Sequence, residues 1–496
     1  MTSEVAGSLS TPAPSTSILS RRTKLFYGLG EAGEGVKTAA LETFLFFYYV
    51  QVVGLSGSLT GLALFVALLF DGFSDPFVGG WSDRTRSRLG RRHPFLYAAP
   101  IPLAIALWFL FRPPEQLGQF EVFLWLTVLT IAARFAMTLY FVPHMALGAE
   151  LSQDFNERVA IGGYRVLFGY LGRIIALGLA FSVFFADRSG FENGQLDRSA
   201  YPHFAVAAGA LVIAFVFISA LGTQRAALSL PGSGEALARG ANKGLVRTLR
   251  LAMSSPSFRA LFLALLVMYL YNGVQFALAL HMNTYFWKLP PAQVQLVFYA
   301  SMMGYILGIP LARPAAEKLD KKAAYMLGIA GSCLVGSSPT LLRLAGLAPE
   351  NGEVTLLPLL LGASFLAGFI GCIPVVLSSA MLADVADEYD LTHHGRAEGL
   401  FFGANAFCRK ASLGLGGAVA GFVIDLIRFP AKVDPAAAPA DAVLRLGVTY
   451  GPIMLTVLFA GLAIMIPYSL DRERHASIAE ALAHRRRRGE LASSQS

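Results

Sequence analysis

The stretch Leu59–Trp81 reads LTGLALFVALLFDGFSDPFVGGW and governs how the rest of the chain is interpreted. It is long and apolar enough for a helix that crosses a membrane, since such a helix needs about 20 mostly apolar residues. Two carboxylates, Asp71 and Asp75, nevertheless lie inside it. Their i, i+4 spacing puts both on one face of a helix, and ionisable groups within a membrane span are functional candidates by default. The stretch therefore predicts a transmembrane helix with a polar site built into it.

The two carboxylates need a positive partner. Two like charges about 5 Å apart repel by about 3 kcal/mol at an effective dielectric of 20, so a proton, a metal cation or a basic side chain must share the site. Pro76 removes a backbone donor and frees a carbonyl one turn back as a further ligand. A purely structural pair, bonded to Arg84 and Arg88 at the end of the helix, is the alternative.

The composition of the whole chain agrees with a bilayer environment. The 496 residues are 55% hydrophobic and only 15% charged, with a mean hydropathy of +0.56, whereas roughly a quarter of an ordinary soluble protein is charged. The cysteines show no disulfide or zinc spacing, and no phosphate-binding or hydrolase motif is present. Basic residues are not interleaved with stacking aromatics, so nucleic acid is not an expected partner. We expect neither an enzyme nor a bound cofactor.

Apolar segments long enough to span a membrane follow one another from Lys24 onward, about twelve in all. They are Leu25–Val53, Leu59–Trp81, Phe95–Phe111, Phe120–Leu147, Ile161–Ala186, Phe204–Leu221, Phe258–Phe286, Gln293–Leu311, Ala323–Leu342, Leu356–Leu382, Gly399–Leu426 and Val443–Leu470. The polar stretch 224–257 divides them into two sets of six, as in transporters built from repeated bundles. We predict a disordered N-terminus 1–23, bundles 24–223 and 258–470 joined by this linker, and a basic tail 471–496.

Loop charges predict the orientation. Basic residues are concentrated between Arg84 and Arg92, in the central linker and at Arg485–Arg488, whereas Gly54–Ser58 has none. Cytoplasmic loops accumulate Lys and Arg, so the linker and both termini are expected in the cytoplasm. The net charge of +8 is then mainly a topology signal, helped by contact with anionic membrane lipid.

Further charges lie inside the predicted spans. Glu34 and Lys37 in the first span are i and i+3 apart and can neutralise one another, so a structural pair and a substrate contact are equally open. Lys410 follows Phe401–Asn405 well inside the eleventh segment. We expect Lys410 to face a cavity rather than the lipid, because charges at that depth face the bundle interior.

The run Asp71–Gly79 (DGFSDPFVG), followed by Ser82–Arg92 (SDRTRSRLGRR), is similar to the signature of the glycoside-pentoside-hexuronide:cation symporters. This branch of the major facilitator superfamily contains the melibiose permeases. KLFYGLG from Lys24, DVADEY from Asp384 and the segment Arg396–Lys410 extend the resemblance over nearly the whole chain. It implies a major facilitator fold, with twelve transmembrane helices in two pseudo-symmetric six-helix bundles.

The resemblance also implies roles for individual residues. Asp71 and Asp75 match the paired carboxylates that bind the coupling cation, Na+ or H+, and Thr138 matches a hydroxyl contact. Ser74 stands where those permeases have Asn. Lys410 matches a lysine beside this site, and Arg165 matches an arginine near the sugar pocket.

The part of the site that binds sugar departs from the family pattern. Phe141 and Met145 stand where melibiose permeases have an aspartate and a tryptophan, and neither grips sugar hydroxyls as a carboxylate does. Either Glu34 and Lys37 substitute, or the substrate is less hydroxylated. The segments Phe141–Leu147 and Thr392–Glu398 also resemble the sodium-dependent lysophosphatidylcholine symporters, which implies an amphiphile as the alternative substrate.

The resulting prediction is a monomeric, multi-pass symporter of the bacterial inner membrane for a sugar, glycoside or uronide. Predicted substrate or coupling residues are Lys410, Arg165, Glu34, Lys37, Phe141, Met145 and Asn405. Predicted cytoplasmic gate residues are Asp83, Arg84, Arg88, Arg91 and Arg92, with the arginines contacting acidic groups such as Asp83 and Glu150. A membrane enzyme and a non-transporting sensor are the other classes, and neither has a supporting motif.

Overall fold

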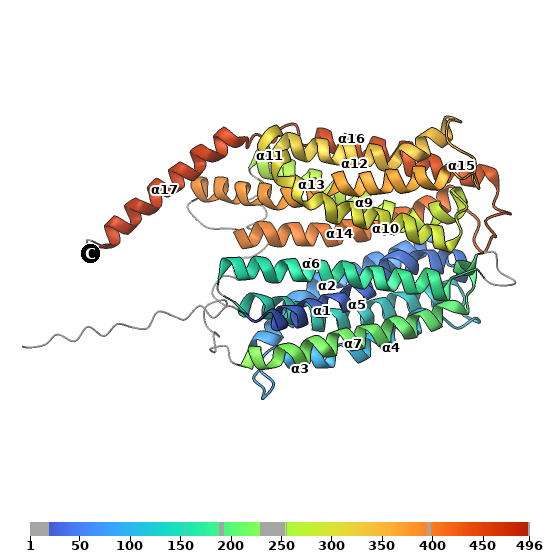
Figure 1. Ribbon diagram of the computed structural model, residues 1–496, viewed down its shortest axis with the longest axis horizontal. Helices are drawn as coiled ribbons and strands as arrows, with labels where there is room; N and C mark the ends of the chain where they lie inside the picture. Colours follow the sequence, from blue (N-terminus) through green and yellow to red (C-terminus); the bar gives the residue numbers. More distant parts are fainter. Residues whose placement is uncertain are drawn as a thin grey trace, which may run out of the picture.

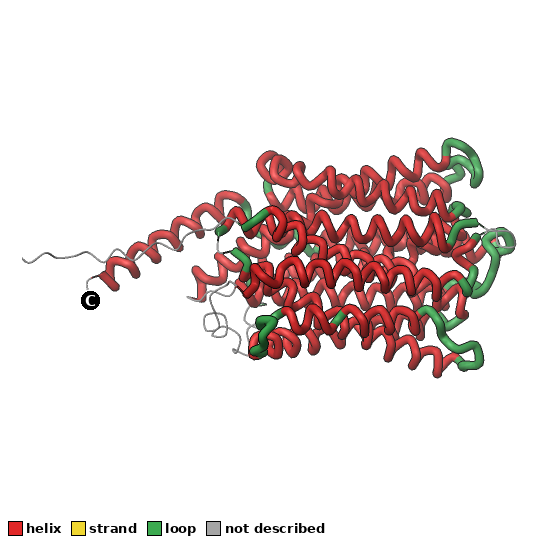
Figure 2. The backbone as a smooth tube through the Cα atoms, turned by 60° about the horizontal axis from the view of Figure 1, so that its bottom comes forward, coloured by secondary structure: helices red, strands yellow, loops and turns green. Residues whose placement is uncertain are grey.

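The computed structural model describes residues 19–152, 154–187, 193–228, 253, 255–393 and 398–494. Most of these residues lie in long helices that run roughly parallel to one another (Figures 1 and 2). The first half consists of α1 (Arg21–Thr38) with the π-helical segments η1 (Ala39–Leu45) and η2 (Tyr48–Val53), α2 (Gly57–Arg84), α3 (His93–Ala98), α4 (Pro100–Leu110), α5 (Gln119–Glu150), α6 (Phe155–Leu179) with π-helical η3 (Ala180–Phe184), η4 (Gly194–Leu196) and α7 (Ala200–Leu228).

The second half lies against the first (Figure 1). It consists of α9 (Pro256–His281) with π-helical η5 (Met282–Phe286), α10 (Pro291–Gly308), η6 (Ile309–Leu311), α11 (Ala312–Leu319), α12 (Lys321–Leu344), α13 (Leu356–His393), α14 (Glu398–Leu426), α15 (Ala440–Val448), π-helical η7 (Thr449–Ile453) and α16 (Met454–Ala463). A last helix, α17 (Arg472–Ser494), projects from one end of the bundle (Figure 1).

The predicted membrane spans are present as helices. Among the described residues, ten helical runs are long and apolar enough to cross a membrane. The run from α1 to η2 and helix α14 are of comparable length but carry charges, such as Lys37 in α1 and Lys410 in α14. The prediction of twelve transmembrane helices in two six-helix bundles is confirmed, and the chain is an integral, multi-pass membrane protein.

Parts of the predicted terminal and linker segments lie outside the described residues, namely 1–18, 229–252, 254 and 495–496, as do 394–397. Where the structure describes these segments, it extends the helices. Helix α1 begins at Arg21, α7 continues to Leu228, α9 begins at Pro256, and the described tail is helical from Arg472.

Short polar side chains begin several of these helices. Ser20, Ser56 and Ser255 each accept a hydrogen bond from a backbone N–H in the first turn of α1, α2 and α9, respectively, and Asp154 does the same for α6. Such caps satisfy N–H groups that have no partner within the helix. The first span ends at Gly54, whose φ of 87° is readily adopted only by glycine.

The outer surface is apolar. On α2, a stripe of large exposed side chains at helical spacing consists of Leu62, Val66, Leu69, Phe73, Phe77 and Trp81. Phe73 has the most exposed side chain of the stripe, at 78%. A continuous apolar stripe of this kind is expected where a helix faces lipid hydrocarbon. The carboxylates of Asp71 and Asp75 lie off this stripe and line the interior.

The two halves pack closely at the end opposite to α17, which we call the far end. There, a Cβ added to Gly61 of α2 would lie 2.6 Å from the Cα of Ala418 in α14, so the two backbones are in direct contact. Near the α17 end of α14, by contrast, a Cβ at Gly403 would meet none of the described atoms within 4 Å. Small residues therefore let α2 and α14 approach closely at the far end.

Hydrogen bonds also join the two halves at the far end. The hydroxyl of Tyr285 donates to Gln51 Oε1 over 3.0 Å. Both carboxylate oxygens of Asp425, in α14, accept hydrogen bonds of 2.8 Å from the backbone N–H groups of Gly57 and Ser58. Asp425 therefore caps the first turn of α2 from the opposite half.

Candidate functional site

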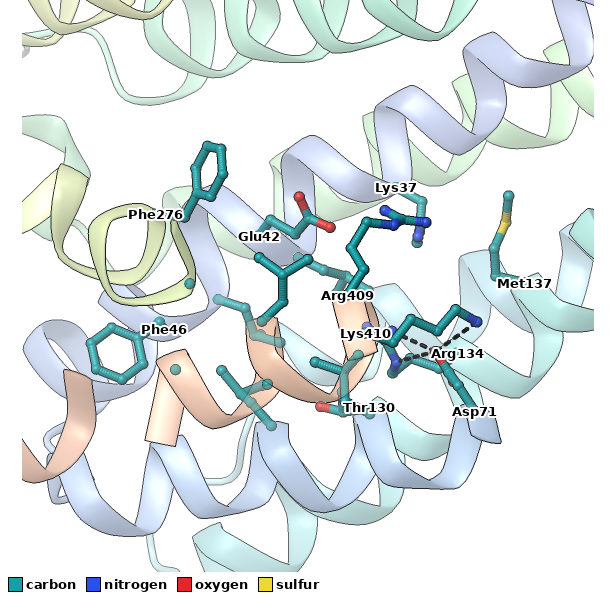
Figure 3. Close-up of a pocket in the computed structure, with 18 of the residues that line it drawn as sticks. Lys37, Glu42, Phe46, Asp71, Thr130, Arg134, Met137, Phe276, Arg409 and Lys410 are labelled. Carbon is teal, nitrogen blue, oxygen red and sulfur yellow. Dashed lines mark hydrogen bonds and ion pairs between the residues drawn. The ribbon is translucent and has the colours of Figure 1, made fainter. Parts of the chain in front are cut away.

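A cavity lies between the halves, near the middle of the long helices. It encloses about 1250 Å³ of empty space, including the part open to solvent. Helices α1, α2 and α5, together with η1, line it from the first half, and α9 and α14 line it from the second half. Figure 3 shows the charged side chains of Asp71, Arg134, Arg409 and Lys410 around this space.

Asp71 and Asp75 both belong to the cavity lining, as their spacing on α2 predicts. The guanidinium of Arg134, from α5, donates from Nε and Nη2 to Asp71 Oδ2 over 3.0 and 2.5 Å. The ammonium group of Lys410 contacts Asp75 Oδ2 and lies 3.7 Å from Asp71 Oδ2. Thr138 donates its hydroxyl hydrogen to Asp75 Oδ1 over 3.1 Å.

Basic side chains therefore offset the mutual repulsion of the two carboxylates. Arg134 comes from the same half as the aspartates, whereas Lys410 comes from the opposite half. The Lys410–Asp75 ion pair is thus a bond between the two bundles. Arginine is permanently charged, whereas a lysine ammonium is a compact point charge on a flexible stem.

Oxygen ligands also remain at this site. Asp71 Oδ1 and Thr130 Oγ1 are buried and form no hydrogen bond among the described residues. The hydroxyl of Ser74 is buried and donates to the backbone oxygen of Asp71 over 3.5 Å, within α2. Carboxylate and hydroxyl oxygens of this kind suit a proton or a hard monovalent cation.

Three of the other predicted substrate residues line the cavity, namely Glu34, Lys37 and Phe141. Lys37 Nζ lies 3.0 Å from Glu34 Oε1, and the hydroxyl of Thr38 donates to the same oxygen over 2.7 Å. Glu34 and Lys37 therefore neutralise one another while facing the cavity.

Arg165, Met145 and Asn405 lie outside this lining. Arg165 Nε lies 3.4 Å from a carboxylate oxygen of Glu31, so this arginine is paired within the first half. Asn405 accepts a hydrogen bond from the hydroxyl of Tyr269 over 3.3 Å, within the second half. The structure therefore does not bring these residues to the aspartate pair.

Two of the predicted gate arginines have acidic partners. Arg92 is buried and lies 2.6 Å from Asp83 and 2.7 Å from Glu150, and Arg91 lies 3.3 Å from Glu150. These pairs tie the loop after α2 to the end of α5, inside the first half. Arg84 and Arg88 are exposed.

Two lining arginines are not among the site residues predicted from the sequence. Arg134 was visible only as a charge inside a span, with nothing to indicate that it binds Asp71. Arg409 directly precedes Lys410 and lines the cavity. The rule that charges inside membrane spans face the bundle interior applies to both residues.

This arrangement defines a class of protein. Twelve membrane-spanning helices in two bundles, with a charged cavity between them at mid-depth, form a transporter of the major facilitator fold. A solved structure of the nucleoside transporter NupG (D323A mutant) has this fold, with a TM-score of 0.61 at 13% sequence identity, covering 89% of this chain and 98% of that one.

Sequence comparison identifies the family. The chain belongs to the MFS/sugar transport protein family, whose model matches residues 26–472. It is 24% identical to the putative glycoside/cation symporter YagG of Escherichia coli, over 95% of this chain and 97% of that protein. It is 26% identical to the mouse sodium-dependent lysophosphatidylcholine symporter 1, over 94% of this chain and 88% of that protein. The resemblance to the glycoside-pentoside-hexuronide:cation symporters is confirmed, and the chain is a transporter rather than an enzyme.

Proposed function

We propose that this protein is a symporter that couples inward movement of Na+ or H+ to uptake of a sugar, glycoside or uronide. It would act in a bacterial inner membrane with both termini and the linker in the cytoplasm, as its loop charges suggest. The cavity would bind substrate near the membrane midplane and open to each side in turn. The observation that carries the proposal is the ion pair of Asp75 with Lys410 from the opposite bundle.

In this proposal, Lys410 holds Asp75 in place of the coupling cation. A cation that binds Asp75 and Thr138 replaces the ammonium group and releases the bond between the bundles. Because Arg134 keeps Asp71 neutralised, the exchange takes place at Asp75. Substrate that favours the cation-bound arrangement is then coupled to the ion, and the coupling is reciprocal by thermodynamic linkage.

The cavity lining also supports the amphiphile alternative. Leu41, Leu45, Phe46, Phe276 and Leu413 line it beside the charged groups. An apolar wall next to a charged cluster suits a molecule with a polar head and an apolar portion. The lysophosphatidylcholine symporter among the relatives favours the same class. We further propose that the protein is a monomer and that it contacts membrane lipid.

The test replaces Asp75 by Asn in purified protein reconstituted into vesicles. A set of radiolabelled glycosides, uronides and lysolipids is offered, with sodium and pH gradients imposed separately. The wild-type protein should accumulate one of these compounds against its gradient. Asp75→Asn should abolish accumulation, because the neutral amide has no negative charge to hold a cation and forms no ion pair with Lys410.

The control variant is Asp441→Asn. Asp441 forms an exposed pair with Arg445 on α15, away from the cavity, so this change should leave accumulation intact. Uphill uptake by Asp75→Asn at the wild-type level would remove Asp75 from the coupling mechanism and overturn the proposal.

A further inference from the structure

One charged side chain of the described cavity lining, that of Arg409, differs from the others in its ion pairing. Each carboxylate of the described lining has a basic partner: Glu34 pairs with Lys37, Glu42 with Arg173, Asp71 with Arg134, and Asp75 with Lys410. Arg409 also lines the cavity. Among the described residues it has no carboxylate partner within ion-pair distance. The described lining therefore holds four acidic and four basic side chains, and Arg173, which lies outside the lining but pairs with Glu42, brings the whole group to an excess of one positive charge.

The position of Arg409 suits ligand binding. It precedes Lys410 on α14 and is exposed, and Figure 3 shows it among the side chains around the cavity. Phe276 and Leu413 also line this space. A guanidinium presents a planar set of N–H donors that matches carboxylate and phosphate groups. Sugar hydroxyls are instead gripped by carboxylates, and every carboxylate of this lining is already paired.

We infer that the transported substrate carries a negatively charged oxygen group, a carboxylate or a phosphate, and that Arg409 binds it. This inference rests on the proposed function and names its substrate class. A uronide and a lysophospholipid share this chemistry, whereas a neutral glycoside lacks it.

The same charge count links the substrate to the coupling ion. A monovalent cation bound alone adds a second excess positive charge to a cavity within the membrane, where charge is expensive. A singly charged anion on Arg409 offsets that addition, so the cavity carries the same charge empty and fully loaded. Each ligand therefore raises the affinity for the other, and the coupling is equal in both directions.

The experiment measures binding to purified protein in detergent with two matched pairs of probes. The first pair is 4-nitrophenyl glucuronide and 4-nitrophenyl glucoside, and the second is octanoyl lysophosphatidate and monooctanoylglycerol. The anionic member of at least one pair should bind about tenfold more tightly than its neutral partner, as expected for charge-assisted hydrogen bonds. The pair that shows the preference distinguishes a carboxylate from a phosphate.

Variants of Arg409 assign the preference to this side chain. Arg409→Gln should bring the two members of the pair to within about threefold of one another, and Arg409→Lys should restore most of the preference. Arg445→Gln, which changes an exposed arginine outside the cavity, should keep the full preference. Thermal unfolding of each variant verifies that it is folded.

Three results would overturn the inference: equal binding of the anionic and neutral members, an unchanged preference in Arg409→Gln, or no binding of either anion. These failures differ from failure of the proposed function, because binding in detergent requires no ion gradient. If the anion preference holds while Asp75→Asn still transports uphill, only the coupling proposal fails.

Discussion

The two halves of this transporter are joined in different ways at the far end and at the centre. At the far end, α2 and α14 touch through glycine backbone, and Asp425 caps α2 with two hydrogen bonds. At the centre, the ion pair between Asp75 and Lys410 connects the same two helices. Packing of the two backbones depends on their shape alone, whereas the cationic partner of an ion pair, here Lys410, can be replaced by another cation. In the proposed mechanism, the far end therefore holds the two halves together and the centre responds to the coupling ion.

The largest effect is expected for Arg134→Gln, which removes the permanently charged guanidinium next to Asp71 at the centre. Asp71 is only 4% exposed and would lose its closest partner. A coupling cation would then be drawn to Asp71 as well as Asp75. The ion concentration for half-maximal uptake should fall by about tenfold, since a positive charge that repels the cation is removed next to the site. Uptake is measured in vesicles over a range of sodium concentrations and, separately, of pH.

Arg313→Gln serves as the control for this measurement, because Arg313 pairs with Glu317 at an exposed position on α11. An unchanged or higher ion requirement in Arg134→Gln would show that the arginine does not compete with the ion. The dependence of uptake on ion concentration would then be due to Lys410 alone.

The next largest effect is expected for a substitution that disturbs helix packing at the far end. Gly61→Leu places a large side chain where α14 backbone already lies, and overpacking of this kind costs about 1–3 kcal/mol. Thermal unfolding of the purified protein should begin several degrees lower. Gly80→Leu is the matched control on the same helix, because a Cβ at Gly80 meets nothing within 4 Å. Equal losses in the two variants would contradict close packing at the far end.

The smallest of the expected effects is that of a substitution at Asp425, which tests whether this residue keeps the far end closed. Asp425→Asn keeps one of the two acceptors for the N–H groups of α2, replaces the other by an NH2 donor, and removes a charge from the start of that helix, the charge being worth about 0.3–1 kcal/mol. The far end should open about threefold more often. An impermeant thiol reagent added from that side reports this as faster labelling of a single cysteine introduced at Leu64, a cavity residue. Native Cys333, Cys372 and Cys408 are replaced beforehand.

Asp434→Asn provides the comparison for Asp425→Asn. The carboxylate of Asp434 accepts a hydrogen bond from Ala436 within its own loop, so it does not join the halves. Labelling rates that rise equally in both variants would deny Asp425 a specific role in closing the far end.

Features that depend on local sequence could be predicted well. The spans followed from apolar length, because a membrane helix forms all its backbone hydrogen bonds within itself. The common face of Asp71 and Asp75 and the pairing of Glu34 with Lys37 followed from helical spacing. In each case the partners lie within two turns of one helix, so their geometry is fixed by the helix alone.

Contacts between helices could not be predicted in the same way. Arg134 binds Asp71 on another helix, and only the relative rotation of α2 and α5 brings them together. In the same way, the packing of α6 against α1 brings Arg165 to Glu31, whereas Asp71 and Asp75 lie on α2. The resemblance to known symporters indicated Lys410 beside the cation site, but it gave no signal for Arg134 or Arg409.

The π-helical segment η1 gives the first span a property beyond its charges. It carries Leu41, Glu42 and Leu45 of the cavity wall. A π-helical turn holds more residues than an α-helical turn, so rewinding one such turn by a single residue would swivel the side chains beyond it by about 100°. The cavity wall can then present a different set of side chains to the substrate while the helix stays continuous. Such a change gives the first span a way to bind a substrate of one shape and then to release it.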